Sequence, residues 1–151
     1  MALYGGQRDI SLFRHLNREL MGNIITQQCA FYKFRLNETK VNIYGESMNK
    51  TWYPGVEVYA LIDKEPESAR YEGFGLDTDQ NVTFKLDRWM LEEKGIYPEV
   101  GDIINWNSGY FEIDNTNEIQ LVGGQSYNNF SVVCSTFMVS KSNLNIEERS
   151  K

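Results

Sequence analysis

The chain has 151 residues, of which 41% are hydrophobic and 24% are charged. This length predicts one domain that can bury a core without disulfides or a metal ion. Fifteen Lys and Arg residues against 21 Asp and Glu residues give a net charge of −6, which excludes the basic character by which proteins grip nucleic acid. The two cysteines, Cys29 and Cys134, form neither a disulfide framework nor a metal cluster and favour a reducing compartment.

No apolar stretch approaches the roughly 20 residues that a membrane-spanning helix needs. The first eight residues lack the apolar region of a signal peptide. We therefore expect a protein that is neither exported by the usual route nor embedded in a membrane.

The first predicted element is an amphipathic helix, which Asp9 or Ser11 can cap and which Gly22 can end. Its apolar face consists of Leu12, Phe13, Leu16 and Leu20. His15, the single histidine, borders this face. We expect it to have a packing or surface role, because it has no second histidine with which to bind a metal.

β-Branched and aromatic residues in alternating patterns predict strands in the next part of the chain, at 24–36, 41–44, 56–62 and 81–87. The acidic stretch between the last two, residues 63–79, predicts a loop or an irregular hairpin. Residues 88–94 have helical composition, and Gly95 follows as a stop.

The last third of the chain predicts four more strands, at 103–106, 110–114, 119–122 and 130–139. A tight connection at 107–109 joins the first two, with Gly109 free to adopt a positive φ. These patterns predict a mainly β fold: a small antiparallel β-barrel or sandwich with an N-terminal helix and a possible second short helix. We expect one domain over 1–139 and a C-terminal arm over 140–151.

No pattern of catalytic, cofactor-binding or metal-ligating residues is present. The chain lacks a phosphate-binding P-loop, a zinc-binding HExxH and a GxSxG nucleophile motif. Asp77 and Asp79 resemble the start of a calcium loop, but the required glycine and glutamate do not follow. Glu112 and Asp114 alternate with apolar residues on one strand, which indicates that they lie on its solvent-exposed face. We therefore expect a protein that is not an enzyme and has no cofactor.

Charge is distributed unevenly along the chain. The first forty residues contain six basic and three acidic residues, whereas residues 57–79 contain seven acidic and two basic residues. Complementary potentials of this kind can attract copies of a protein head to side. The alternative interpretation is that both regions are solvated surfaces without a binding role.

Several short segments together resemble the neck proteins of T-even-like, contractile-tailed bacteriophages, over about residues 10–147. They are Ile43-Tyr44-Gly45-Glu46-Ser47, Trp52-Tyr53-Pro54-Gly55-Val56, Gly101-Asp102-Ile103-Ile104-Asn105-Trp106, Tyr110-Phe111-Glu112-Ile113-Asp114 and Val122-Gly123-Gly124-Gln125. The hairpin formed by the third and fourth segments is also similar to the head-closure proteins of tailed phages more widely.

This resemblance implies a small β-barrel in the virion neck that forms a ring below the portal and joins the DNA-filled head to the tail. The implied partners are further copies in a hexamer or dodecamer, portal-side neck proteins, and tail terminator, sheath or tube proteins. Packaged DNA would pass through the ring without specific binding, and assembly would take place in the host cytoplasm. A tail terminator ring is the neighbouring alternative.

Loops, terminal arms and unpaired strand edges are the parts of such a subunit that dock on neighbours. The candidate contact residues are Tyr44, Glu46, Trp52, Tyr53, Glu65, Glu67, Asp77, Asp79, Leu144 and Ile146. An alternative function is a small barrel that binds an oligosaccharide or single-stranded nucleic acid by stacking on aromatic side chains. Its candidate platforms are Trp52, Tyr53, Tyr59, Trp89, Trp106 and Tyr110.

Overall fold

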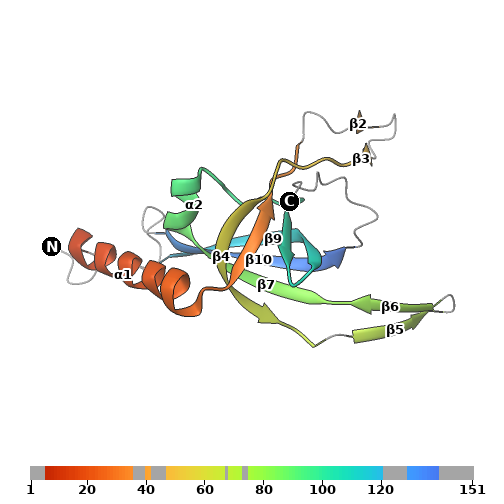
Figure 1. The fold of residues 1–151 in the computed structure, drawn as a ribbon, viewed down its shortest axis with the longest axis horizontal. Coiled ribbons are helices and arrows are strands. Elements are labelled where there is room, and N and C mark those ends of the chain that lie inside the picture. The colour runs from red at the N-terminus through yellow and green to blue at the C-terminus, as the bar shows by residue number, and fades with distance from the viewer. Residues whose placement is uncertain are drawn as a thin grey trace.

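Six antiparallel strands close into a barrel (Figure 1), which confirms the predicted antiparallel β-barrel. The computed structural model describes residues 6–35, 40–41, 47–66, 68–72, 75–120 and 129–139, and the side chains of 6–35, 50–66, 80–119 and 129–139. The strands follow one another around the barrel in the order β1 (Gln28–Tyr32), β4 (Val56–Lys64), β7 (Asn81–Asp87), β10 (Asn129–Val139), β9 (Gly109–Gln120) and β8 (Ile103–Trp106).

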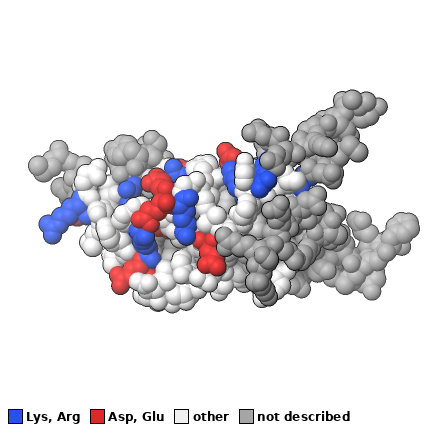
Figure 2. All heavy atoms as spheres, turned by 45° about the horizontal axis from the view of Figure 1, so that its top comes forward, with Lys and Arg blue, Asp and Glu red and all other residues white. Residues whose placement is uncertain are grey.

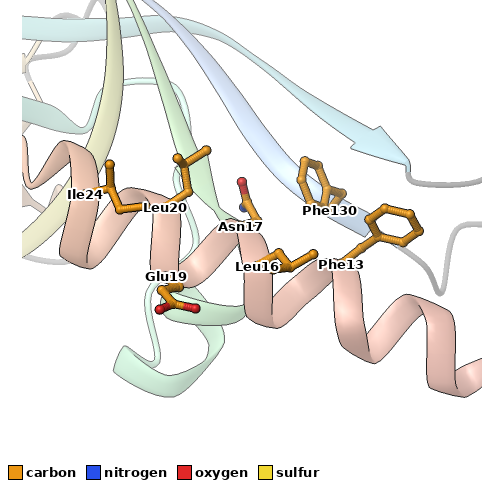
Figure 3. Close-up of a pocket in the computed structure, with 7 residues that line it drawn as sticks. All are labelled: Phe13, Leu16, Asn17, Glu19, Leu20, Ile24 and Phe130. Atoms are coloured by element: carbon orange, nitrogen blue, oxygen red, sulfur yellow. The ribbon is translucent and has the colours of Figure 1, made fainter.

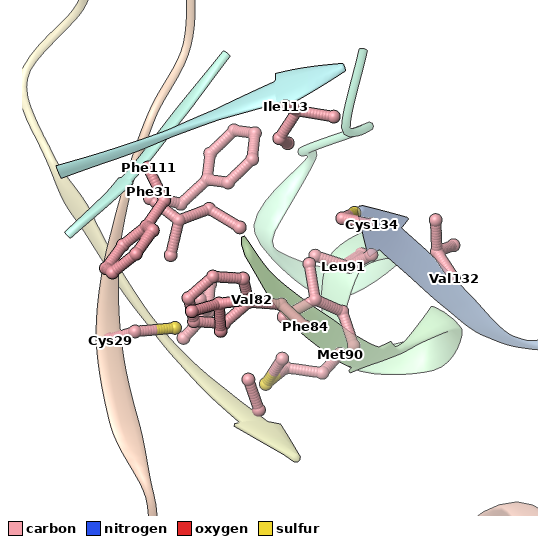
Figure 4. Close-up of a cluster of buried hydrophobic side chains, with 14 residues drawn as sticks. Cys29, Phe31, Val82, Phe84, Met90, Leu91, Phe111, Ile113, Val132 and Cys134 are labelled. Atoms are coloured by element: carbon pink, nitrogen blue, oxygen red, sulfur yellow. The ribbon is translucent and has the colours of Figure 1, made fainter. Parts of the chain in front are cut away.

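The barrel is filled by apolar side chains, as Figure 4 shows. Strand β7 illustrates why: Val82, Phe84 and Leu86 alternate with polar residues and are fully buried, because successive side chains of a strand point to opposite faces. Phe84 packs edge-on against Phe111 of β9, with ring centroids 5.7 Å apart. The interior of the barrel is therefore a packed core and not a pore.

Two helices accompany the barrel. Helix α1 (Gln7–Glu19) continues directly into a π-helical segment, η1 (Leu20–Ile25), and α2 (Arg88–Lys94) follows β7. Helix α2 confirms the predicted second helix: Asp87 caps its start, Gly95 ends it with φ 66°, and it contributes Met90 and Leu91 to the barrel core.

Two hairpins project from the barrel: β2 (Lys40–Val41) with β3 (Ser47–Asn49), and β5 (Ser68–Glu72) with β6 (Gly75–Asp79). The β5–β6 hairpin continues the barrel strands β4 and β7. The last hydrogen bond between those two strands runs from the Glu65 N–H to the Asn81 carbonyl oxygen, at 3.2 Å. Figure 1 shows this hairpin and α1 at opposite ends of the long axis of the molecule. Of the two structures predicted for 63–79, the hairpin is therefore the observed one. We call residues 65–80 the acidic arm.

The N-terminal helix differs from its prediction at both ends. Gly6 rather than Asp9 or Ser11 occupies the N-cap position, and no side chain makes a capping bond there. Gly22 does not end the helix, which runs on to Ile25 and stops where Thr26 adopts a φ of 49°. Because the π-helical segment takes up residues 24 and 25, the strand predicted at 24–36 starts later, and β1 spans Gln28–Tyr32. Beyond it, Phe34 forms an isolated bridge with Trp52, and residue 36 lies outside the described residues.

The last third of the chain differs in two places. The strand predicted at 110–114 and residues 119 and 120 of the next predicted strand belong to one strand, β9, because β10 pairs with it from Tyr110 to Gln120 and a register shift near Ser135 absorbs the irregularity. Residues 121 and 122 lie outside the described residues. In the tight connection, Asn107 and Ser108 adopt positive φ values of 50° and 64°, and Gly109 does not. A Cβ at Gly109 would lie 3.1 Å from the ring of Phe111, so a larger residue here would crowd that ring, and the turn geometry does not call for glycine.

Candidate assembly surface

A partly buried polar contact attaches α1 to the barrel. The Asn17 side-chain amide donates to Asp87 at 3.1 Å, and the other carboxylate oxygen of Asp87 accepts the Met90 N–H at 3.2 Å. Asp87 is only 1% exposed, and burial raises the pKa of its carboxyl above the usual range, although these hydrogen bonds oppose the shift. One carboxylate thus caps α2 and holds α1 against the same end of the barrel.

A second attachment joins α1 to α2 on the surface. The Arg18 guanidinium donates to both carboxylate oxygens of Glu93, at 2.6 Å each, and lies over the Trp89 ring with its carbon 5.3 Å from the centroid. His15 packs edge-on against the same ring at 4.8 Å. The single histidine is therefore a packing residue at the α1–α2 junction, in line with its predicted role.

The apolar face of α1 does not pack on the barrel. Ile10 and Met21 are buried, at 3% and 4% exposure, and together with Asn17 they define the attached side of the helix. At about 100° per residue, Phe13, Leu16 and Leu20 lie roughly a quarter turn away from this side, whereas Leu12, 56% exposed, lies nearly opposite to it. With Ile24 of η1, the first three form the apolar stripe of α1, in which Phe13 is 50% exposed, Leu16 53%, Leu20 40% and Ile24 71%.

A shallow groove runs beside this stripe. Figure 3 shows Phe130 of β10 next to Phe13, with Leu16, Leu20 and Ile24 following along the helix. Only Asn17 and Glu19 contribute polar side chains to the lining. A contiguous exposed apolar surface with a polar border is typical of a protein-interaction site, whereas single exposed apolar residues are not. We take this groove and the apolar stripe as the candidate assembly surface.

The acidic arm lies at the other end of the molecule from this surface. Residues 65–80 contain five acidic residues and one basic residue, whereas residues 6–25 contain three basic and two acidic residues. Figure 2 shows basic side chains at the α1 end and interspersed charges of both signs over the middle of the described surface. The backbone of the acidic arm, as far as it is described, therefore lies at the other end of the molecule from α1.

The structure places only some of the predicted contact residues. Asp77 and Asp79 lie in β6, and Glu65 is exposed at the base of the arm. Tyr53 is 48% exposed beneath the Arg35 guanidinium, whose carbon lies 4.5 Å from the ring centroid. The remaining predicted contacts except Trp52 lie outside the described residues; they are Tyr44, Glu46, Glu67, Leu144 and Ile146.

Trp52 lies inside the molecule. It is 2% exposed, packs edge-on against Phe34 at 5.8 Å, and donates its ring N–H to the Gly101 carbonyl oxygen at 3.1 Å. In the isolated chain it supports the segment that leads from β3 to β4. A contact of Trp52 with a neighbouring subunit stays a prediction.

An ionic cluster around the buried Asp102 holds the chain beyond β1 against the turn before β8. Asp102, 1% exposed, accepts hydrogen bonds from the Phe34 N–H at 2.9 Å, the Glu99 N–H at 2.8 Å and the Lys33 ammonium at 3.0 Å. Burial raises the pKa of the Asp102 carboxyl, while these donors act in the opposite direction. This cluster fixes the base from which the chain leaves toward β2 and β3.

Most aromatic residues proposed as ligand platforms contact other parts of the same chain. Trp89 lies beneath His15 and Arg18, and Trp106 packs against Phe84 and Phe111. Of the six candidate platforms, Tyr53 alone is mainly exposed. The described side chains therefore offer no row of stacking surfaces.

Three further observations on the described residues concern thiol reactivity, metal binding and membrane insertion. Burial raises the pKa of both Cys29 and Cys134 to about 12, so neither thiol is a ready nucleophile at neutral pH. No cluster of three or more His, Cys, Asp or Glu side chains suited to a metal ion occurs within the described residues. None of the described helices is long and apolar enough to cross a bilayer.

Sequence analysis missed the candidate assembly surface as a whole. The apolar face of α1 was predicted, but nothing in the pattern distinguishes a face that packs on its own barrel from one that faces outward. Ile24 was assigned to a strand and Phe130 to the final strand, so their place beside the helix was not predicted. The signal that could have indicated it is the continuous apolar spacing from Phe13 through Leu20 to Ile24.

The fold and this surface define a small closed β-barrel with an N-terminal helix attached at one end. No protein-family model and no curated protein matches the sequence. Among solved structures, the chain is similar to a component of the virion of a native gene transfer agent particle, with a TM-score of 0.51 and 14% sequence identity. The likeness covers 75% of this chain and 94% of that one, and at this identity it shows a shared fold.

Proposed function

We propose that this protein is a structural virion protein, a subunit of the neck or head-closure ring that joins the DNA-filled head of a tailed phage to its tail and helps to retain the genome. The observation that supports the proposal is the fold, because 94% of a chain of a gene transfer agent virion is matched by 75% of this chain. The resemblance of the sequence to phage neck proteins supports the finer assignment to the neck.

The surface properties fit a subunit that functions by assembly. Within the described part of the chain, the apolar stripe of α1 stays about half exposed, and the acidic arm projects at the other end. Repetition around a ring axis would multiply the net charge of −6 per subunit, and the resulting field would repel DNA phosphates. A lumen of this kind lets packaged DNA pass without holding it.

The proposal is tested by inactivating the gene in the phage that encodes this chain and examining the products by electron microscopy. We expect filled or leaking heads and separate tails of normal length, with joining restored when the wild-type protein is added to the extract. Tails of irregular length would instead indicate a tail terminator. Intact infectious particles that lack the protein would contradict the proposal.

Binding of a ligand is tested separately by tryptophan fluorescence with an oligonucleotide or an oligosaccharide. We expect no saturable change at low salt, because the three tryptophans are engaged in contacts within the chain. A saturable change that a Tyr53→Ala variant abolishes would favour the ligand-binding function over the structural one.

A further inference from the structure

Helices α1 and η1 form one continuous helical unit, residues 7–25, which a single residue links to the barrel. The Ala60 N–H donates to the Gln27 carbonyl oxygen at 3.0 Å, and β1 begins at the next residue, so the chain belongs to the barrel from Gln27 onward. On the helical side, the Thr26 N–H donates to the Met21 carbonyl oxygen at 3.0 Å. Thr26 therefore lies alone between the helical unit and the barrel.

The backbone of Thr26 is strained. Its φ of 49° and ψ of 31° lie in the left-handed region, where the Cβ of an L-residue crowds the following carbonyl oxygen. This region is rare for residues branched at Cβ, and glycine is the usual residue at such a helix end. The attached position of the helical unit thus keeps Thr26 in a conformation that it can leave once the unit separates from the barrel.

The contacts that attach the helical unit are separate from the barrel core. Its polar contacts are the two attachments described above, of which the Arg18–Glu93 pair lies on the surface. Ile10 and Met21 are buried, but the apolar cluster that the described side chains form inside the barrel does not include them. Separation of the helical unit would therefore leave the core cluster in place.

A cleft of about 450 Å³ lies between the helical unit and the barrel. It is lined by Arg18, Gly22 and Asn23 of the helical unit and by Tyr59, Met90, Glu93 and Lys94 of β4 and α2. Protein interiors contain few voids larger than a water molecule. At this cleft, the boundary between the helical unit and the barrel is therefore not packed like the core.

We propose that residues 7–25 detach from the barrel as one unit by rotation about Thr26, while the barrel stays folded. Relief of strain at Thr26 favours the detached state, and the attachments of the helical unit favour the attached state. Asp87 loses its Asn17 donor on detachment but keeps the Met90 N–H, so α2 remains capped. This conformational device goes beyond the proposed function and does not depend on it.

Amide hydrogen exchange of the full-length protein under native conditions tests the proposal. An isolated helix as short as α1 is only marginally stable in water, so its amides exchange once the unit detaches. We expect the amides of α1 to be at least about 100-fold less protected than those of β7, because they exchange through an opening smaller than global unfolding. Equal protection in the two elements would overturn the proposal.

Val82→Ala separates detachment from unfolding of the barrel. Val82 is 1% exposed in the core, so its truncation weakens the barrel equally in the attached and detached states. The amides of β7 should lose at least about tenfold in protection, whereas those of α1 should change by less than about twofold. An equal loss in both elements would show that the helical unit opens only when the barrel unfolds, which overturns the proposal.

Thr26→Gly tests the position of the hinge. Glycine removes the strain of the attached state, so exchange of the α1 amides should slow about fivefold. Ser108→Gly is the matched control, because Ser108 has a φ of 64° in the connection between β8 and β9, outside the helical unit. It should leave exchange in α1 unchanged. Equal exchange in α1 of Thr26→Gly and of the wild type would overturn the assignment of the hinge.

Thiol labelling distinguishes detachment of the whole unit from fraying at its start. Ile10 and Met21 are buried near the two ends of the unit, so a thiol introduced by Ile10→Cys or by Met21→Cys reacts only after an opening. The native cysteines are buried and stay unreactive. We expect the opening constants of the two variants to agree within about threefold. Labelling of Ile10→Cys that is more than about tenfold faster than that of Met21→Cys would indicate fraying and overturn the proposal.

Discussion

The barrel interior and the apolar stripe of α1 contain the same kinds of side chain in opposite environments. Phe84, Leu86 and Leu91 are fully buried inside the barrel, whereas Phe13, Leu16 and Leu20 are about half exposed along the helix. The first group is covered by strands of the same chain on every side. The second group stays partly exposed because polar contacts on another side of the helix hold it in place. Among the described residues, one apolar cluster is therefore covered by the fold and the other is not.

The largest expected difference between the two regions is in stability. Phe84→Ala should lower the free energy of unfolding by about 3–5 kcal/mol, because it removes a fully buried ring that packs against Phe111 and Trp106. Leu16→Ala should change it by less than about 0.5 kcal/mol in the monomer. Urea denaturation of dilute protein measures both. Equal losses in the two variants would mean that the stripe is covered within the chain.

A smaller loss is expected where β4 begins. A Cβ at Gly55 would lie 2.8 Å from ring carbons of Tyr32, so Gly55→Ala should destabilise the barrel by about 1–3 kcal/mol through overpacking. Gly22, in the helical segment that carries the stripe, has open space around its Cβ position. Gly22→Ala should therefore be neutral or stabilise by up to about 1 kcal/mol. Thermal unfolding of the pair checks both signs.

The ionic cluster around Asp102 provides a test that depends on pH. The pKa of Asp102 is higher in the folded protein than the ordinary carboxyl value. Its contribution to the free energy of unfolding is therefore fully present below the ordinary carboxyl pKa. This contribution is lost as the pH rises through the pKa of the folded state. Lys33→Met removes the cation 3.0 Å away and should raise the pKa of Asp102 further. The deficit of the variant should be small near pH 4 and reach about 1–2 kcal/mol at pH 7, since Lys33 is partly exposed.

Urea denaturation at the two pH values measures this deficit. Glu99→Gln serves as the control, because Glu99 binds the same ammonium at 2.7 Å but is itself exposed. It should show a smaller deficit than Lys33→Met at neutral pH. A Lys33→Met deficit that is constant between the two pH values would show that Asp102 does not titrate as described.

The smallest effect is expected at the surface attachment of α1. Arg18 and Glu93 are each nearly half exposed, so a double-mutant cycle with alanine at both positions should give a coupling energy below about 1 kcal/mol. By comparison, Asn17→Ala should cost about 1–3 kcal/mol, because it leaves a buried carboxylate oxygen of Asp87 without its donor. A larger effect at Arg18 would mean that the surface pair, rather than the buried contact, fixes the helix.

The sequence predicted those elements whose local pattern agrees with their environment in the barrel. Strand β7 matches its predicted range because each apolar residue of the alternation points into one core, and α2 matches because Asp87 and Gly95 provide both end signals. The end of α1 was wrong because Gly22 tolerates a helical conformation, so the helix continued through two isoleucines with strand propensity. Strand β9 was predicted as two strands because only pairing with β10 carries it across the polar residues 115–117.

Local sequence patterns predicted which residues make up the candidate assembly surface, but not where these residues lie in the fold. The amphipathic helix and the acidic segment were both predicted from residue types alone. Their position at opposite ends depends on the Asn17–Asp87 bond and on the pairing of β4 with β7, which join residues far apart in the sequence. The orientation of the stripe follows from the same long-range contacts.

The continuity of the acidic arm with β4 and β7 has a geometric consequence. Because this hairpin prolongs two barrel strands, its orientation relative to the barrel is set by the strand path near Pro66 and Gln80. Inserting one residue into each strand of the hairpin would reverse which face it presents, whereas inserting two would restore that face and move the tip outward by about 7 Å.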